Sequence, residues 1–249
     1  MSLCRSHAYT MCRLARTLCI TKGKPFMKPA QAAIARLRYL LSPRASFERL
    51  LKQEQIYLYA GDVPADIQYR KFVGLSLSQS NTRHIRYDVT AKLPLPDCSV
   101  DGYQSEDVFE HIEPTRLPAV INEIYRVLKP NGIFRLSIPD YRCDILQART
   151  VKNDSGELVF DPGGGGSYEN GKVVGGGHVW FPKYESVKAI VDSTHFNDVK
   201  FYHYYDTSGQ PVTEPIDYSI GHVMRTPDHD DRVRDPYRPM SIVLDCRKS

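Results

Sequence analysis

The stretch HIRYDVTAKLPLPDCSVDGYQSEDVFEHIEPTRLPAVINEIYRVLKPNGIFRLSIPD, residues 84–140, decides the fold. Residues 100–104 form a short β-rich run, and residues 115–128 carry apolar side chains at helical spacing. Lys129-Pro130-Asn131-Gly132 is a strong stop and turn signal, and residues 133–138 form the next β-rich run. A strand, a helix and a strand in this order predict a βαβ unit in an α/β fold with a mostly parallel, doubly wound sheet.

Three further β-rich runs precede this unit, at residues 56–60, 72–77 and 83–89. In doubly wound sheets, ligands bind beyond the carboxyl ends of the strands. Candidate site residues therefore directly follow the predicted strands, and they are Gly61, Asp62, Ser76, Asp88, Ser105, Glu106 and Asp140.

Composition places the chain among globular proteins. It has 249 residues, 41% of them hydrophobic, which excludes wholesale disorder. Its apolar runs are far shorter than the ~20 residues of a membrane-spanning helix. The six cysteines contain no C-x-x-C pair, so neither a disulfide framework nor a structural zinc site is predicted, and no metal-ligating residues are assigned. A reducing compartment, the cytoplasm, is the expected location.

Basic residues concentrate near the N-terminus. Residues 1–52 hold eleven Lys or Arg and one acidic residue, Glu48, so the rest of the chain is net acidic and no nucleic-acid partner is expected. Residues 1–27 are predicted to be a disordered or targeting-like basic extension, with a mitochondrial presequence or a later start at Met11 or Met27 as alternatives. Residues 28–53 are predicted to form helices that either pack on the domain or contact an anionic membrane surface. The oligomeric state is not predicted.

An ordered series of motifs resembles the class I S-adenosylmethionine-dependent methyltransferases. It comprises Y-D-V-T at 87–90, L-P-L-P-D-C-S-V-D at 93–101, S-E-D-V-F-E-H-I at 105–112 and E-I-Y-R-V-L-K-P-N-G at 123–132. The likeness is greatest to methyltransferases of bacterial surface-polysaccharide gene clusters. It implies a Rossmann-like, seven-stranded sheet with helices on both faces in a domain spanning 54–249. It also implies a helix at 182–193, strands at 194–205 and 240–246, and an antiparallel last strand.

The resemblance also implies an S-adenosyl-L-methionine site. The glycine turn after the first strand corresponds to Ala60-Gly61-Asp62, the ribose position to Ser76, the adenine position to Asp88 with Val89, and the position near the methionine moiety to Ser105 and Glu106. Two positions depart from the family pattern: the usual G-x-G turn keeps only Gly61, and Ser76 replaces the usual acid. A serine gives up the two charge-assisted acceptor positions of a carboxylate.

Methyl transfer to a sugar hydroxyl gains from a general base, because the hydroxyl is a poor nucleophile. The candidates are His178, His111 and Asp140. His178 stands beside Trp180 after a glycine-rich insertion at residues 153–177, which is expected to be a lid or a simple flexible loop. The function implied is O-methylation of a sugar or of a glycan or lipid-linked intermediate, with a small-molecule or glycan acceptor.

Two other functions stay open at this point. The first is a catalytically inactive methyltransferase fold that serves as a binding or scaffold protein, because the cofactor motif is degenerate at Gly61 and Ser76. The second is a nicotinamide-dependent enzyme, against which the absence of a G-x-G-x-x-G motif after the first strand argues.

Overall fold

The computed structural model describes residues 43–249. The chain divides into two units, residues 1–42 and 43–249. The predicted extension over residues 1–27 and most of the predicted helical segment over residues 28–53 lie outside the described residues. In the described part of the chain, no helix is both long and apolar enough to cross a membrane.

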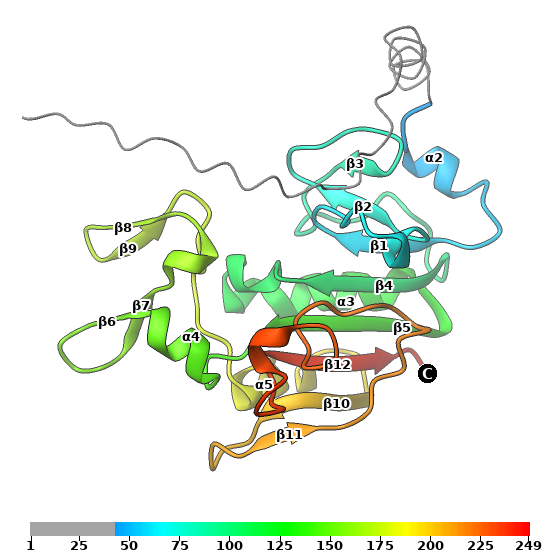
Figure 1. The fold of residues 1–249 in the computed structure, drawn as a ribbon. Coiled ribbons are helices and arrows are strands. Elements are labelled where there is room, and N and C mark those ends of the chain that lie inside the picture. The colour runs from blue at the N-terminus through cyan, green and yellow to red at the C-terminus, as the bar shows by residue number, and fades with distance from the viewer. Residues whose placement is uncertain (1–42) are drawn as a thin grey trace, which may run out of the picture. The chain divides into compact units, whose positions relative to one another are not determined.

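An eight-stranded sheet forms the centre of residues 43–249, in the order β11-β10-β12-β5-β4-β1-β2-β3 (Figure 1). Strands β3, β2, β1, β4 and β5 pair in parallel, whereas β12 pairs antiparallel with both β5 and β10. The expected antiparallel last strand is therefore confirmed. The strands are β1 (Tyr57–Ala60), β2 (Val73–Ser76), β3 (His84–Arg86), β4 (Val100–Glu106), β5 (Leu128–Pro139), β10 (Asp198–Tyr205), β11 (Pro211–Thr213) and β12 (Ser241–Arg247).

The sheet has one strand more than the seven expected. The additional strand, β11, pairs antiparallel with the end of β10, and Pro211 lies opposite Tyr205. β11 is three residues long and begins with proline. It therefore lacks the run of alternating residues by which a strand is recognised in sequence, although proline is tolerated at a strand's first residue and on an edge strand.

Three helices contribute to the main core on one face of the sheet. They are α2 (Phe47–Leu50), α3 (Leu117–Val127) and α5 (Tyr184–Asp192). The apolar stripe of α3 packs into this core with Val187 and Val191 of α5. Leu50 of α2 is buried in the same core, so α2 belongs with the sheet rather than with a separate N-terminal segment.

The second face has no α-helix over it in the described residues, so the expectation of helices on both faces is wrong there. A 3₁₀ turn, η1 (Ile67–Tyr69), covers β1, and the loop after β11 covers β10 and β12. The physical reason is the length of the connections. Residues 61–72 and 77–83 join β1 to β2 and β2 to β3, and these spans are too short for a helix that crosses the sheet.

The predicted turn at residues 129–132 is incorporated into β5, which begins at Leu128. Asn131 adopts a positive φ of 63° and its N–H donates to the carbonyl of Lys248. The N–H of Lys248 in turn donates to the carbonyl of Gly132. The backbone of Lys248 thus supplies the hydrogen-bond partners that Asn131 and Gly132 lack within the turn itself.

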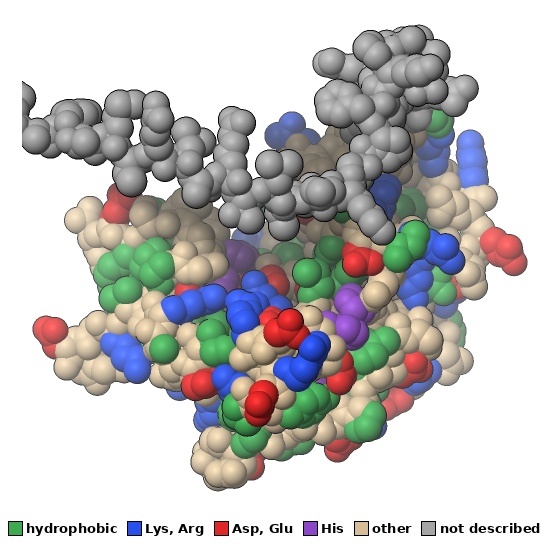
Figure 2. All heavy atoms as spheres, in the orientation of Figure 1, with side chains coloured by type: hydrophobic (Ala, Val, Ile, Leu, Met, Phe, Trp, Pro, Cys, Tyr) green, Lys and Arg blue, Asp and Glu red, His purple; other side chains and the backbone are tan. Residues whose placement is uncertain are grey.

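The glycine-rich insertion at 153–177 forms ordered elements rather than a loop without structure. Two antiparallel hairpins, β6 (Val151–Lys152) with β7 (Leu158–Phe160) and β8 (Ser167–Glu169) with β9 (Lys172–Val174), extend beyond the sheet next to α4 (Asp144–Arg149) (Figure 1). Acidic and basic side chains are interspersed on the face drawn in Figure 2. That face carries no extended field of one sign.

Candidate functional site

A pocket of about 520 Å³ opens at the carboxyl ends of β1, β2 and β3. This is the edge at which parallel sheets bind ligands. Five of the eight predicted cofactor-binding residues line it, namely Gly61, Asp62, Ser76, Asp88 and Val89. Of the three predicted catalytic residues, His111 lines it.

Gly61 makes the tight turn at the end of β1. Its φ of +87° lies in the left-handed region that favours glycine, and its N–H donates to the carbonyl of Leu75 at 2.9 Å. A Cβ at this position would lie 3.0 Å from Cγ2 of Val108, on the pocket wall. Backbone therefore reaches the pocket here without a side chain in the way, although only one glycine of the family turn is present.

Ser76 ends β2 and is almost fully buried, at 1% exposure. Its Oγ accepts hydrogen bonds from the N–H groups of Ser78 at 3.1 Å and Gln79 at 2.9 Å. These two bonds use the acceptor capacity of the hydroxyl, so its remaining function is to donate one hydrogen bond. A carboxylate at this position would accept from a ribose instead.

Asp88 follows β3 and is exposed on the pocket rim. Its Oδ1 accepts from the N–H of Thr90 at 2.9 Å and from the Thr90 hydroxyl at 2.8 Å, while Oδ2 has no hydrogen-bond partner among the described residues. The carboxylate is thus oriented by Thr90 and keeps one oxygen for a ligand. Leu77, 71% exposed, lies on the wall with the apolar side chains of Val89, Val108 and Ile112. Exposed apolar surface of this kind suits a flat ring.

Ala60, Ser105 and Glu106 lie outside the pocket lining, although they were predicted to bind the cofactor. Glu106 instead accepts hydrogen bonds from Tyr69 Oη at 2.8 Å, Gln104 Nε2 at 2.7 Å and the N–H of Met224 at 2.9 Å. Burial raises the pKa of Glu106 to about 7, against the lowering effect of these hydrogen bonds. The carboxyl group therefore holds the loop around Met224 against the sheet.

Asp140 also lies away from the pocket lining, buried just after β5. It accepts hydrogen bonds from the N–H of Arg142 at 2.9 Å and the N–H of Tyr205 at 2.8 Å. Burial raises the pKa of Asp140 to about 6, although both hydrogen bonds lower it. These contacts tie the end of β5 to the end of β10.

His178 is buried and lies against His111, with ring centroids 4.7 Å apart. Its Nδ1 is hydrogen-bonded to Tyr141 Oη, which also donates to Oδ2 of Asp161 at 2.6 Å. Arg149 pairs with the same oxygen of Asp161 at 2.6 Å. Burial opposes ionisation of Asp161, but the hydrogen bonds from Arg149 and Tyr141 hold its pKa below the usual value. Burial and then the charge of His111 lower the pKa of His178 to about 4, so this imidazole is neutral at pH 7.

Glu110 is fully buried beside these two histidines and was not predicted as a site residue. Its Oε1 lies 3.5 Å from Nε2 of His178, and neither carboxylate oxygen has a hydrogen-bond partner in the described structure. Burial raises the pKa of Glu110 well above the usual value, and the charge of Asp107 adds to this. The only signal in the sequence was the acid next to His111, which on its own indicates a solvated turn. Tyr141 and Asp161 were missed for the same reason.

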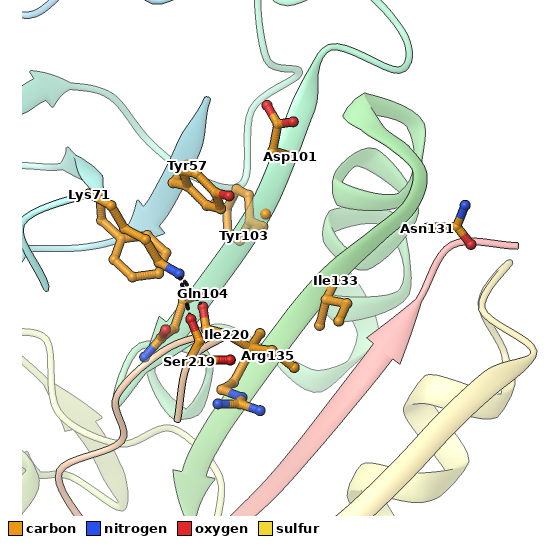
Figure 3. Close-up of a pocket in the computed structure, with 12 residues that line it drawn as sticks. Tyr57, Lys71, Asp101, Tyr103, Gln104, Asn131, Ile133, Arg135, Ser219 and Ile220 are labelled. Carbon is orange, nitrogen blue, oxygen red and sulfur yellow. Dashed lines mark hydrogen bonds between the residues drawn. The ribbon is translucent and has the colours of Figure 1, made fainter. Parts of the chain in front are cut away.

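A second, smaller pocket of about 260 Å³ lies on the other face of the sheet (Figure 3). Protein contacts occupy its two cationic side chains. Lys71 Nζ donates to the carbonyls of Ser219 and Ile220, and Arg135 donates to those of Asp217 and Gly221. The pocket at the carboxyl ends of the strands is therefore the stronger candidate site.

A family model described as a methyltransferase domain matches residues 68–136. The matching family is that of methyltransferase domains. The matched segment runs from η1 into β5 and contains Ser76, Asp88, Val89, Ser105, Glu106 and His111.

Known proteins resemble the chain over different lengths. A protein of Mycolicibacterium smegmatis named probable S-adenosylmethionine-dependent methyltransferase is 34% identical over 91 residues, which are 33% of this chain and 34% of that protein. The match thus spans about a third of the curated relative. Two solved structures are similar at low identity: a SAM-dependent methyltransferase of Archaeoglobus fulgidus (16% identity, 87% of this chain and 93% of that one, TM-score 0.47) and the PH0226 protein of Pyrococcus horikoshii OT3 (18%, 88% and 92%, 0.46).

The matched segment includes Ser76 and Asp88, the residues predicted for the ribose and the adenine, but stops short of two other predicted parts. Gly61 and Asp62 precede the matched residues, and Asp140 and His178 follow them. For the glycine turn, which departs from the family pattern, the only support is therefore the geometry of Gly61.

Proposed function

We propose that this chain is an S-adenosyl-L-methionine-dependent methyltransferase whose cofactor binds in the pocket at the ends of β1, β2 and β3. One observation carries the proposal: Gly61, Ser76 and Asp88 come from three different strand ends and line one pocket of about 520 Å³. The methyltransferase domain match over residues 68–136 supports it.

The residues in the pocket fit the three parts of this cofactor. The free Oδ2 of Asp88 suits the adenine amino group, and Leu77 with the apolar wall suits the ring. The hydroxyl of Ser76 has one hydrogen bond left to donate toward a ribose oxygen. Exposed Asp62, next to the turn at Gly61, offers a carboxylate to the ammonium group. The cofactor supplies the methyl group on a sulfonium, and the protein supplies position and desolvation.

We further propose that the acceptor is a hydroxyl group of a sugar or of a glycan or lipid-linked intermediate. His111 supports this, because it lies accessible on the pocket wall and an imidazole there suits removal of a hydroxyl proton. Trp180 does not line this pocket: it packs against the main core and its Nε1 donates to the carbonyl of Phe109 at 3.0 Å.

Calorimetric titration of the full chain with S-adenosylmethionine and its demethylated product tests the cofactor. We expect a dissociation constant in the micromolar range, about −8 kcal/mol. Asp88→Asn should weaken binding about 10-fold to 100-fold, because a charge-assisted hydrogen bond is lost. Asp154→Asn, an exposed acid on the β6–β7 hairpin, should leave it unchanged. A folded protein that gives no binding heat would instead favour an inactive methyltransferase fold.

Transfer of labelled methyl groups to a panel of nucleotide sugars, glycolipids and amines tests the acceptor. Hydroxyl acceptors should be labelled and amines should not. His111→Asn should lower kcat by about 10²-fold or more and leave cofactor affinity nearly unchanged if it acts as the base. Labelling of amines alone would overturn the acceptor class while leaving the cofactor site intact.

A further inference from the structure

Three potential metal ligands from two segments far apart in the sequence meet beside the pocket. Glu110 and His111 belong to a 3₁₀ turn, η2 (Phe109–His111), directly after β4, and His178 comes from the loop that follows the β8–β9 hairpin. Each offers one ligand atom, and the three atoms lie within 4.8 Å of one another. The N–H of Val179 donates to the carbonyl of Glu110 at 2.9 Å and fixes the two segments together.

Hydrogen bonding leaves Nε2 of His178 as an acceptor. Asp161 is paired with Arg149, so Tyr141 donates its hydroxyl proton to Asp161. The Tyr141 oxygen is then left to accept from Nδ1–H of His178. Nε2 therefore carries a lone pair, and it lies 3.5 Å from Oε1 of Glu110. A metal-binding histidine usually donates its other ring N–H to an oxygen acceptor, as Nδ1–H of His178 does here to the Tyr141 hydroxyl, which is itself bonded to the Asp161 carboxylate.

Glu110 provides the strongest indication that something else completes this group. Both of its oxygens are buried and have no hydrogen-bond partner among the described residues. Two acceptors, Oε1 of Glu110 and Nε2 of His178, therefore face each other with no donor between them. Buried polar groups in native proteins are nearly always satisfied, so this pair needs either a shared proton or a bound cation.

The glycine run of the insertion packs its backbone closely against His178. A Cβ on Gly164 would lie 2.7 Å from Nε2 of His178, and one on Gly163 would lie 2.5 Å from Cζ of Arg149. Only glycine therefore allows η4 (Pro162–Gly164) to approach both side chains so closely.

We propose that Glu110, His111 and His178 form a binding site for a divalent transition-metal ion of the zinc type. Two imidazoles and one carboxylate are a known zinc donor set with an open fourth position, whereas Mg²⁺ and Ca²⁺ prefer oxygen ligands. Bonds of about 2.1 Å place tetrahedral donors about 3.4 Å apart, so the widest pair must close by a little over 1 Å. Because His111 also lines the pocket, the open position is reached from there. That this open position takes the acceptor oxygen rests on the proposed function, with the bound ion acidifying the hydroxyl in place of a free His111 imidazole; the ion site itself does not rest on it.

Metal binding by the full chain, without cofactor, tests the site. The protein is stripped with a chelator and equilibrated with Zn²⁺, Co²⁺ or Mg²⁺, and bound metal and the Co²⁺ absorption spectrum are measured. We expect one Zn²⁺ or Co²⁺ per chain, a four- or five-coordinate Co²⁺ spectrum and no retention of Mg²⁺. Glu110→Gln, His111→Asn and His178→Asn should each weaken Zn²⁺ binding at least tenfold.

Two variants keep the test decisive. His111 is less buried than His178, so His111→Asn should fold even if a variant at His178 does not, which circular dichroism checks. His229→Asn is the matched control, because exposed His229 also lies against a second histidine, His222, at 4.0 Å between ring centroids. The proposal is overturned by the absence of stoichiometric Zn²⁺ or Co²⁺ binding, by loss of binding in His229→Asn but not in His111→Asn, or by a thiolate charge-transfer band that assigns the ion to cysteine. Absence of metal would leave a proton shared between Glu110 and His178 as the explanation.

Discussion

Arg135 on β5 and Asp245 on β12 lie opposite each other on adjacent antiparallel strands and form a buried, two-pronged ion pair. The Nε–Oδ1 and Nη2–Oδ2 distances are both 2.7 Å, and the Arg135 side chain is 1% exposed. Nη1 of Arg135 also donates to the carbonyls of Asp217 and Gly221. One guanidinium thus joins two strands to the loop that covers the second face of the sheet. No α-helix among the described residues covers that face.

Removing the charge of Asp245 should destabilise the fold strongly. Asp245→Asn leaves a buried guanidinium without its counter-ion, which costs about 3–5 kcal/mol of unfolding free energy. Chemical denaturation measures this loss. Asp198→Asn is the control, because Asp198 forms an exposed pair with Arg247 at 3.6 Å between the neighbouring strands β10 and β12, and should cost less than about 1 kcal/mol. Equal losses in the two variants would mean that the buried pair contributes no more than a surface pair.

Glu106 should make stability fall as pH rises. Its folded-state pKa of about 7 lies above the 4.5 of the unfolded chain, mainly because of burial. Between these values the native state holds a proton that the unfolded state has released, so the unfolding free energy decreases from about pH 4.5 to about pH 7. The decrease from this group is about 3 kcal/mol.

Comparison of the wild type with Glu106→Gln across that pH range isolates this effect. As pH rises from 4.5 to 7, the unfolding free energy of the wild type should fall relative to that of Glu106→Gln. Parallel stability curves would show that the carboxyl group does not titrate there in the native state.

The sequence predicted those parts of the fold that depend on local pattern. The bounds of β4 and α3 were predicted to within two residues, because the apolar stripe of α3 is a local signal, whereas β5 begins at Leu128 and includes the predicted turn at residues 129–132. The order of residues at strand ends also predicted that Gly61, Ser76 and Asp88 would meet. The covering of the second face could not be predicted in this way, because it depends on connections too short for helices and on the pairing of Arg135 with Asp245.

The histidine cluster depends on tertiary structure for a similar reason. Glu110 and His178 are separated by an insertion that, from its glycines, looked like a flexible loop. In the structure, Gly163 and Gly164 allow close packing on Arg149 and His178. A buried carboxylate has no mark in the sequence that separates it from a solvated one, so Glu110, Tyr141 and Asp161 were found only when their surroundings were known.

Ser76→Asp should strengthen cofactor binding. A carboxylate can accept from ribose hydroxyls and still accept from the N–H groups of Ser78 and Gln79, which the serine oxygen now serves. An added charge-assisted hydrogen bond of about 1.5–3 kcal/mol corresponds to roughly 10-fold to 100-fold in affinity for S-adenosylmethionine, read by calorimetry. Ser78→Asp adds the same charge to the exposed pocket lining and should change affinity little. Equal gains in both variants would point to general electrostatic attraction of the cationic cofactor.

Gly61→Ala should impair the cofactor site and the turn together, and a second glycine separates the two effects. Gly61 and Gly209 have nearly the same positive φ, +87° and +82°, so alanine at either position costs about 1–2 kcal/mol of backbone strain. A Cβ at Gly61 would approach Val108 to 3.0 Å at the pocket wall, whereas one at Gly209 meets nothing within 4 Å.

Thermal unfolding should therefore show similar losses of stability in Gly61→Ala and Gly209→Ala. Calorimetry should show weaker S-adenosylmethionine binding in Gly61→Ala alone, since only there does the added methyl group intrude on the backbone that faces the methionine moiety. Unchanged affinity in a folded Gly61→Ala protein would place the cofactor's methionine end elsewhere in the pocket.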